Sequence, residues 1–157
     1  MKTPDAWPDL AGRLAEGRHV LPVRIYYEDT DFSGVVYHGS YVRFMERGRT
    51  DFLRLMGFGH VALGKGEHSP VPLAFAVRRM AIEFLKPARI DDLVEVETHL
   101  HEVAGARIIL TQTIRRAGQT LVTAEVTVVM IDSAGRAQRL PEGVAELFAG
   151  GPRLTGR

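Results

Sequence analysis

A long amphipathic segment dominates the first half of the chain. Over residues 39–56, apolar positions recur at the three-and-four spacing of one helical face. Val42 and Leu53 widen this apolar face, which indicates a helix that lies deep in the domain. Gly57 and Gly59 follow it as stop signals. The pattern therefore predicts one long, largely buried helix over residues 39–56.

Strand-like segments lie on both sides of this helix. Before it, Val23, Ile25 and Tyr27 alternate with polar neighbours. After it, residues 60–71 are typical of a loop or short helical turn, and further alternating segments follow. The pattern predicts strands over residues 21–29, 73–85, 94–101, 107–115 and 122–130. Short turns at Gly105 and Gly118 favour an antiparallel meander.

This order of elements predicts an α+β domain in which an antiparallel sheet packs on a single helix. We expect residues 1–20 to form an N-terminal extension, either a partly ordered tail or one or two helical turns over residues 8–14. The domain itself is predicted over residues 21–148 and ends in a short helix over residues 142–148. Residues 149–157 are predicted to be a flexible tail.

Composition narrows the function classes. A chain of 157 residues fits one domain with one core, and its net charge of +1 gives no field that would favour nucleic acid. The absence of cysteine excludes disulfides, thiolate zinc sites and thiol nucleophiles, which fits a cytoplasmic enzyme. No apolar run approaches the roughly 18 residues of a membrane span, so we expect a soluble, intracellular protein.

The candidate chemistry lies just before the long helix, where Glu28, Asp29 and Asp31 place three carboxylates within four positions. A helix start exposes unpaired amide groups and partial positive charge, which polarise a carbonyl oxygen or hold an oxyanion. A nearby carboxylate can activate water or attack an acyl carbon itself. Asp31 followed by a helix start near His38 therefore suits hydrolysis of an ester or thioester.

Each of these residues also has a structural interpretation. Asp31 could be a turn or capping aspartate, and Glu28 and Asp29 could pair with Arg24 or Arg47. His38 could act through its backbone amide, act as a base through its ring, or be structural. Glu46 is the second choice for a catalytic acid, with an ion pair to Arg43 or Arg49 as its alternative.

No metal site is predicted. His99 and His101 share one face of a strand, but no third ligand stands at a supporting spacing. Arg78, Arg79 and Lys86 could bind the phosphates of a nucleotide-bearing substrate, or could be solvated cations at strand ends. A glycine-rich phosphate-binding loop is missing from the sequence, which argues against nucleotide chemistry proper.

Two stretches carry a resemblance to a known family. Residues 23–58, VRIYYEDTDFSGVVYHGSYVRFMERGRTDFLRLMGF, closely resemble the Tol-Pal-associated acyl-CoA thioesterases of the YbgC type. These belong to the hot-dog superfamily, as does 4-hydroxybenzoyl-CoA thioesterase. Further similarity runs through residues 75–98, FAVRRMAIEFLKPARIDDLVEVET, so the resemblance covers roughly residues 21–132.

The resemblance implies a hot-dog fold, a five-stranded antiparallel sheet wrapped around one long central helix. It implies a homodimer or homotetramer with active sites at the dimer interface. It also implies hydrolysis of acyl-CoA, with Asp31 as the catalytic aspartate and the His38 amide at the helix start. The aspartate acts as nucleophile or as general base in this family. No cofactor is expected, because coenzyme A is part of the substrate.

We assign further residues to substrate binding on this basis: Gly34, Val36, Tyr37, Arg78, Arg79 and Lys86. One alternative is another acyl-thioester reaction on the same fold, a hydration or dehydration with His38 and Glu46 as the acid and base. The other is mainly a protein-interaction role in envelope maintenance, with contacts to envelope or phospholipid-synthesis proteins. A cytoplasmic protein, peripheral to the inner membrane, would fit this second alternative.

Overall fold

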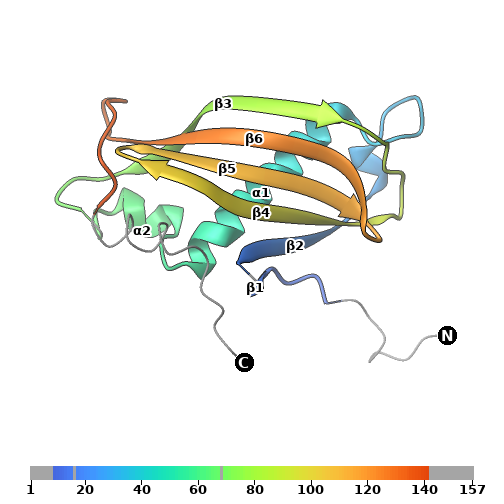
Figure 1. The fold of residues 1–157 in the computed structure, drawn as a ribbon, viewed down its shortest axis with the longest axis horizontal. Coiled ribbons are helices and arrows are strands. Elements are labelled where there is room, and N and C mark those ends of the chain that lie inside the picture. Colours follow the sequence, from blue (N-terminus) through green and yellow to red (C-terminus); the bar gives the residue numbers. More distant parts are fainter. Residues whose placement is uncertain (1–8, 16, 68, 142–157) are drawn as a thin grey trace.

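One antiparallel sheet curls around one long helix in the computed structural model, which describes residues 9–15, 17–67 and 69–141 (Figure 1). The long helix is α1, His38–Leu55, and a short helix α2, His60–Gly64, follows it. The sheet has six strands in the order β1-β2-β4-β5-β6-β3. Their bounds are β1 Arg13–Ala15, β2 Arg18–Arg24, β3 Ala74–Phe84, β4 Leu93–Ala104, β5 Arg107–Arg116 and β6 Gln119–Ile131.

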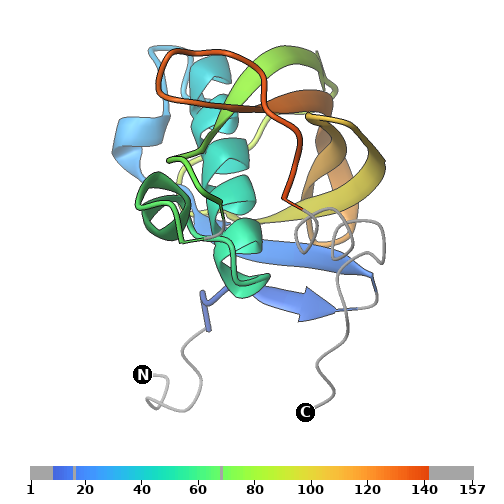
Figure 2. The same ribbon diagram turned by 90° about the vertical axis from the view of Figure 1, so that its left-hand side faces the viewer.

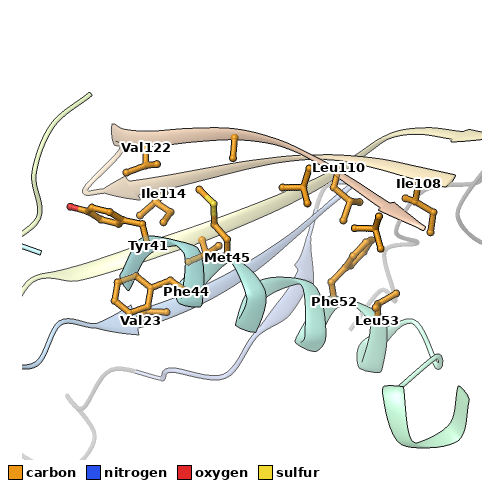
Figure 3. Packing of buried hydrophobic residues seen from close by; sticks show 14 of the residues in the cluster. Val23, Tyr41, Phe44, Met45, Phe52, Leu53, Ile108, Leu110, Ile114 and Val122 are labelled. Carbon is orange, nitrogen blue, oxygen red and sulfur yellow. The ribbon is translucent and has the colours of Figure 1, made fainter. Parts of the chain in front are cut away.

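The apolar face of α1 forms the centre of the core (Figure 3). Phe44, Met45 and Phe52 have no exposed surface and point from α1 toward the concave side of the sheet. Burying side chains of this size contributes roughly 1.5–3 kcal/mol each. Figure 2 shows α1 running within the curve of the sheet, as expected for a helix with such a wide apolar face.

A glycine sets how closely α1 approaches the sheet. A Cβ on Gly48 would lie 3.0 Å from Val96 Cγ1 and 3.3 Å from both Gln112 Nε2 and Thr98 Oγ1. These distances are shorter than ordinary van der Waals contact, so a side chain there would push α1 away from β4 and β5. Glycine at this position lets the helix lie directly on the middle of the sheet.

The predicted helix and the four later strands are confirmed, with ends shifted by three residues at most. The first strand differs, because β2 covers Arg18–Arg24 and residues 27–29 form a 3₁₀ helix instead of its end. The Asp29 carboxylate accepts the Tyr26 amide at 2.9 Å, which favours a turn there. The prediction that the first strand continues to residue 29 is therefore wrong.

The N-terminal residues also differ from the prediction. Residues 9–15 form no helical turn, and β1 pairs with β2 in a hairpin that turns at Gly17, with φ of 77°. The sheet thus has six strands instead of five, and it begins inside the predicted extension. The predicted helix over residues 142–148 and the tail over residues 149–157 lie outside the described residues.

A buried histidine joins β2 to α1. His19 has no exposed surface, and its Nε2 lies 2.7 Å from Asp51 Oδ2. Its ring also packs against Phe52, with centroids 5.8 Å apart. Burial lowers the pKa of His19, although its hydrogen bond to Asp51 acts in the opposite direction. The folded protein therefore favours neutral His19.

This preference predicts acid sensitivity. An unfolded histidine titrates near pH 6.5, and the folded pKa of His19 lies lower, so protons bind the unfolded chain first as pH falls. We expect the contribution of His19 to stability to be present above about pH 6.5 and to decline below it by up to about 1.4 kcal/mol per pH unit. Urea unfolding of wild type and His19→Gln between pH 8 and pH 5 measures it. The wild-type decline should be the steeper, whereas exposed His101→Gln should follow wild type. Equal slopes for wild type and His19→Gln would contradict the assignment.

None of the described helices is both long enough and apolar enough to cross a membrane.

Candidate active site

A tight turn presents Asp31. Thr30 and Val36 form an isolated antiparallel bridge, and between them Asp31 N donates to Val35 O at 3.0 Å. Gly34 N donates back to Asp31 O at 3.0 Å. Gly34 has φ of 83°, a left-handed conformation that glycine adopts without a Cβ penalty. Gly34 thus lets the backbone turn, and the contact with substrate assigned to it from the sequence stays a prediction.

The Asp31 carboxylate is exposed and ionises readily. Its Oδ1 accepts hydrogen bonds from the backbone amide of Ser33, at 2.8 Å, and from the Ser33 hydroxyl. These bonds, the hydroxyl first, lower the pKa of Asp31, and the charge of His38 lowers it further. Asp31 is therefore a carboxylate across the physiological pH range, ready to act as a nucleophile or a base.

Free amides lie at the start of α1. Tyr37, the residue before α1, donates its amide to Asp29 O at 2.9 Å, and Ser40 donates its amide to Tyr37 O at 2.8 Å. The amides of His38 and Gly39 between them have no acceptor among the described residues. This is the ordinary state of the first turn of a helix, and it creates a place for an oxyanion.

A second chain segment holds this helix start in place. Val36 N donates to Ala88 O at 2.9 Å, and Val35 forms an antiparallel bridge with Arg89. The hydroxyl of Tyr41, from α1, accepts the amide of Ala88 at 2.9 Å. The segment after β3 is thereby fixed against the first turn of α1. No sequence pattern pointed to this contact.

These segments enclose an open groove of about 240 Å³. His38 and Tyr41 line it from α1, and the end of β3 supplies Phe84 and Leu85. The His38 ring lies 4.4 Å from the Tyr37 ring and 6.1 Å from the Phe84 ring, measured between centroids. The full lining is Val36, His38, Tyr41, Phe84, Leu85, Lys86 and Pro87.

Three of the sequence-predicted residues therefore meet in the groove: Val36, His38 and Lys86. Tyr37 stands beside it through its ring contact with His38. The assignment of site residues from the sequence did not include Tyr41, Leu85 and Pro87, and the last two are far from Asp31 in the chain. The only available signal was Pro87, which ends the preceding strand and exposes its last residues.

Arg78 and Arg79 do not line this groove. Arg78 stands at an irregularity of β3, where the pairing register with β6 shifts between Val77 and Arg79. Arg79 Nη1 lies 3.6 Å from Glu125 Oε1 in an exposed ion pair. Arg79 is five residues before Phe84, about 17 Å along an extended strand. Within one chain, Lys86 is thus the only one of the three predicted cations that lines the groove.

Of the other two carboxylates in the acidic cluster, Asp29 has an ion-pair partner, whereas Glu28 has none recorded among the described residues. Asp29 is buried and lies 3.3 Å from Arg43, not Arg24 or Arg47 as predicted. Arg24 donates to Asp91 O at 2.7 Å instead. Glu46 is eight residues after His38, about 12 Å along the helix, so the two cannot act as one acid/base pair within a chain. Among the residues that the structure describes, no three metal-binding side chains gather.

Comparison with known proteins identifies the family of this chain. The sequence profile of the thioesterase-like superfamily matches residues 26–148. An acyl-CoA thioester hydrolase YbgC of Escherichia coli O6:H1 is 44% identical over 129 residues, which cover 81% of this chain and 92% of that protein. An acyl-CoA thioesterase YbgC of Haemophilus influenzae is 44% identical over 112 residues, 71% of this chain and 79% of that protein.

A solved structure gives the same answer for the fold. The crystal structure of a probable thioesterase from Bartonella henselae is 44% identical and superposes with a TM-score of 0.76. The match covers 79% of this chain and 99% of the Bartonella protein. The hot-dog fold expected from the sequence is therefore confirmed, with one additional short strand. The chain belongs to the thioesterase-like superfamily and, within it, to the YbgC type of acyl-CoA thioesterase.

Proposed function

We propose that this protein hydrolyses acyl-CoA thioesters to a carboxylic acid and free coenzyme A. One observation supports this most directly: the ionised Asp31 carboxylate interacts electrostatically with His38, the first residue of α1, and the His38 and Gly39 amides have no acceptor among the described residues. Relatives named acyl-CoA thioester hydrolase and acyl-CoA thioesterase are 44% identical to this chain over 129 and 112 residues. The names of these relatives and the chemistry of Asp31 and the helix start indicate the same reaction.

In the proposed reaction, the thioester oxygen lies at the start of α1 and accepts hydrogen bonds from the amides of His38 and Gly39. These bonds strengthen as negative charge develops on that oxygen. Asp31 then has two routes. It attacks the carbonyl carbon and expels the coenzyme A thiolate, leaving an acyl anhydride that water cleaves, or it removes a proton from a water that attacks instead. Neither route requires a cofactor beyond the coenzyme A of the substrate.

Coenzyme A would be held by cations near the groove. Lys86 lines the groove itself and is exposed, so it is the first candidate for a phosphate contact. Arg78 and Arg79 are exposed on the edge strand β3, where a second copy of the chain would bring them toward another groove. Gly34 and Tyr37 complete the proposed substrate contacts. Within one chain, hydration or dehydration by His38 and Glu46 has no geometric support, because about 12 Å of helix separates them.

A homodimer is part of this proposal. Strand β3 is an edge of the sheet, eleven residues long, and its outer edge carries unpaired backbone groups. Exposed Val77, Phe84 and Leu85 lie along or just after this edge. Sedimentation should give a mass of twice 17.4 kDa or a multiple of it. Location in the cytoplasm, attachment to the inner membrane and contacts with envelope or phospholipid-synthesis proteins stay predictions.

The test of the function is thiol release from a panel of short, long and aromatic acyl-CoAs. We expect release of free coenzyme A together with the matching acid in equal amounts. An enoyl or 3-hydroxyacyl product without thiol release would contradict hydrolysis and favour the hydratase alternative. The chain length that gives the highest kcat/KM would identify the substrate class.

The hydrogen bond from the Ser33 hydroxyl to Asp31 predicts a change in the pH profile when it is removed. Removing its hydroxyl in Ser33→Ala leaves only the backbone amide on Asp31, so the pKa of Asp31 should rise toward the usual value of about 4. The acid limb of kcat/KM should move to higher pH, with turnover above pH 7 nearly unchanged. Titration of the Asp31 carboxyl carbon by NMR gives the same shift independently. Ser133→Ala, in another exposed turn, should leave both unchanged. An unmoved Asp31 titration in Ser33→Ala would contradict this account.

A further inference from the structure

One buried residue contacts the chain on both sides of the free amides at the start of α1. Ala88, in the segment after β3, has no exposed surface. Its carbonyl accepts the amide of Val36 at 2.9 Å, and its amide donates to the Tyr41 hydroxyl at 2.9 Å. Val36 lies two residues before His38, and Tyr41 lies two residues after Gly39. The position of Ala88 therefore sets the position of the free amides between them.

An ion pair holds the residues on either side of Ala88. Arg116, the last residue of β5, places its Nη1 2.7 Å from Asp92 Oδ2. The same nitrogen donates to Pro87 O at 3.3 Å, and the same carboxylate oxygen accepts the amide of Arg89 at 2.8 Å. Pro87 and Arg89 are the neighbours of Ala88 in the chain. One pair of charges thus fixes the backbone before and after Ala88.

The pair is partly shielded from water. The side chains of Arg116 and Asp92 are 32% and 25% exposed. Burial raises the pKa of Asp92, but hydrogen bonds from the Arg89 amide and from Arg116 outweigh it, so this pKa lies below its ordinary value. Asp92 is therefore ionised at neutral pH, and a hydrogen bond between two charged groups is roughly twice as strong as a neutral one.

The pair acts at a distance from the reacting groups. Figure 1 shows the ends of β5 and β3 at the same end of the sheet, where the segment after β3 contacts the start of α1. Neither Arg116 nor Asp92 lines the groove at His38. Any effect of the pair on the reaction must therefore pass through Ala88.

We propose that Arg116 and Asp92 are positioning residues, which hold Ala88 and thereby keep the free amides of α1 directed at the thioester oxygen. The inference rests on the proposed hydrolysis. Amides stabilise an oxyanion only from positions that are fixed before the reaction, and a misplacement of about 1 Å can cost roughly 10²-fold in rate. Because these bonds strengthen in the transition state, their loss should lower kcat and leave KM unchanged.

Arg116→Gln tests the pair through the kinetics of thiol release. We expect kcat to fall roughly 10- to 100-fold, with KM within about twofold of wild type. Arg116→Lys keeps a charge for Asp92 and should recover kcat to within about threefold of wild type. Arg136→Gln is the matched control, because Arg136 Nε lies 3.2 Å from Asp132 Oδ2 in a turn that follows the other end of β6. This control should keep the wild-type kcat.

A double variant tests whether the two residues act as a pair. Asp92→Asn keeps an oxygen for the Arg89 amide but loses the charge. Since each single variant breaks the same contact, adding Arg116→Gln to it should lower kcat by no more than about twofold beyond the worse single variant. All these variants keep the backbone bonds that join Ile25 to Asp91 and Asp92, so we expect them to fold.

Amide hydrogen exchange, followed by NMR, tests the position of Ala88 without any substrate. The amides of Val36 and Ala88 should exchange at least about tenfold faster in Arg116→Gln than in wild type. The amide of Met130, which donates to Ala106 O at the other end of the sheet, should keep its wild-type rate. Equal acceleration of all three amides would indicate general destabilisation and overturn the inference.

The kinetic outcomes separate this inference from the proposed hydrolysis. Wild-type protein that releases no thiol would overturn the hydrolysis and, with it, this role of the pair. Normal thiol release by wild type together with an unchanged kcat in Arg116→Gln would overturn the positioning role alone. A rise in KM at unchanged kcat, or losses that multiply in the double variant, would also contradict it.

Discussion

Replacing Asp31 by asparagine is expected to lower the turnover of an acyl-CoA by roughly 10²–10⁴-fold, the range of a single positioned acid or base. The amide keeps the shape of the side chain and its bonds from Ser33, but it can neither attack the acyl carbon nor accept the proton of a water. The variant should fold normally, because Asp31 is exposed. Its substrate binding should change little, so the loss should appear in kcat.

The measurement is thiol release under saturating substrate, with Asp91→Asn as the matched control. Asp91 is an exposed aspartate whose backbone has φ of 70°, a conformation that asparagine also adopts well. It should retain the wild-type rate. Near-normal turnover by Asp31→Asn would remove Asp31 from the mechanism and leave the free amides without a nucleophilic partner.

The largest effect on stability is expected from Gln112→Leu. Leucine matches the size of glutamine but removes the acceptor of Arg49 and the donors to Met45 O and Thr98. The guanidinium then loses its recorded hydrogen bond while it stays buried, which costs about 3 kcal/mol in all. For a chain of this size, that corresponds to a fall in Tm of roughly 6–12 °C.

Thermal and urea unfolding measure this change. Gln119→Leu, at an exposed position on β6, serves as the control and should stay within about 0.5 kcal/mol of wild type. A Gln112→Leu protein as stable as wild type would show that Arg49 reaches water or another partner when Gln112 is lost.

Periodic patterns made most of the fold predictable. The helix at α1 and the strands from β3 to β6 are long, and their alternation or three-and-four spacing repeats several times. The helix start was equally visible, because the three-and-four spacing begins at residue 39, one residue after the first residue of α1. The carboxylate and the free amides of the candidate site therefore followed from local sequence.

What the sequence did not reveal depends on contacts between distant segments. Strand β1 has three residues, too few for any period, and exists through its pairing with β2. The groove wall at Phe84 and Pro87 reaches the start of α1 only because Ala88 bonds to Val36 and Tyr41. Arg78, Arg79 and Lys86 looked equivalent because local patterns do not report which strand lies at the edge or how far along it each cation stands.

The two outer strands of the sheet have very different lengths, and this difference limits how copies can assemble. One edge strand, β1, has three residues, whereas the other, β3, has eleven. A strand of three residues provides too few hydrogen bonds to recruit a partner, so growth can occur from one side alone. If two copies pair through β3, neither copy has a long edge strand left for a third copy. Pairing of this kind would therefore stop at a symmetric dimer and would not continue into a filament.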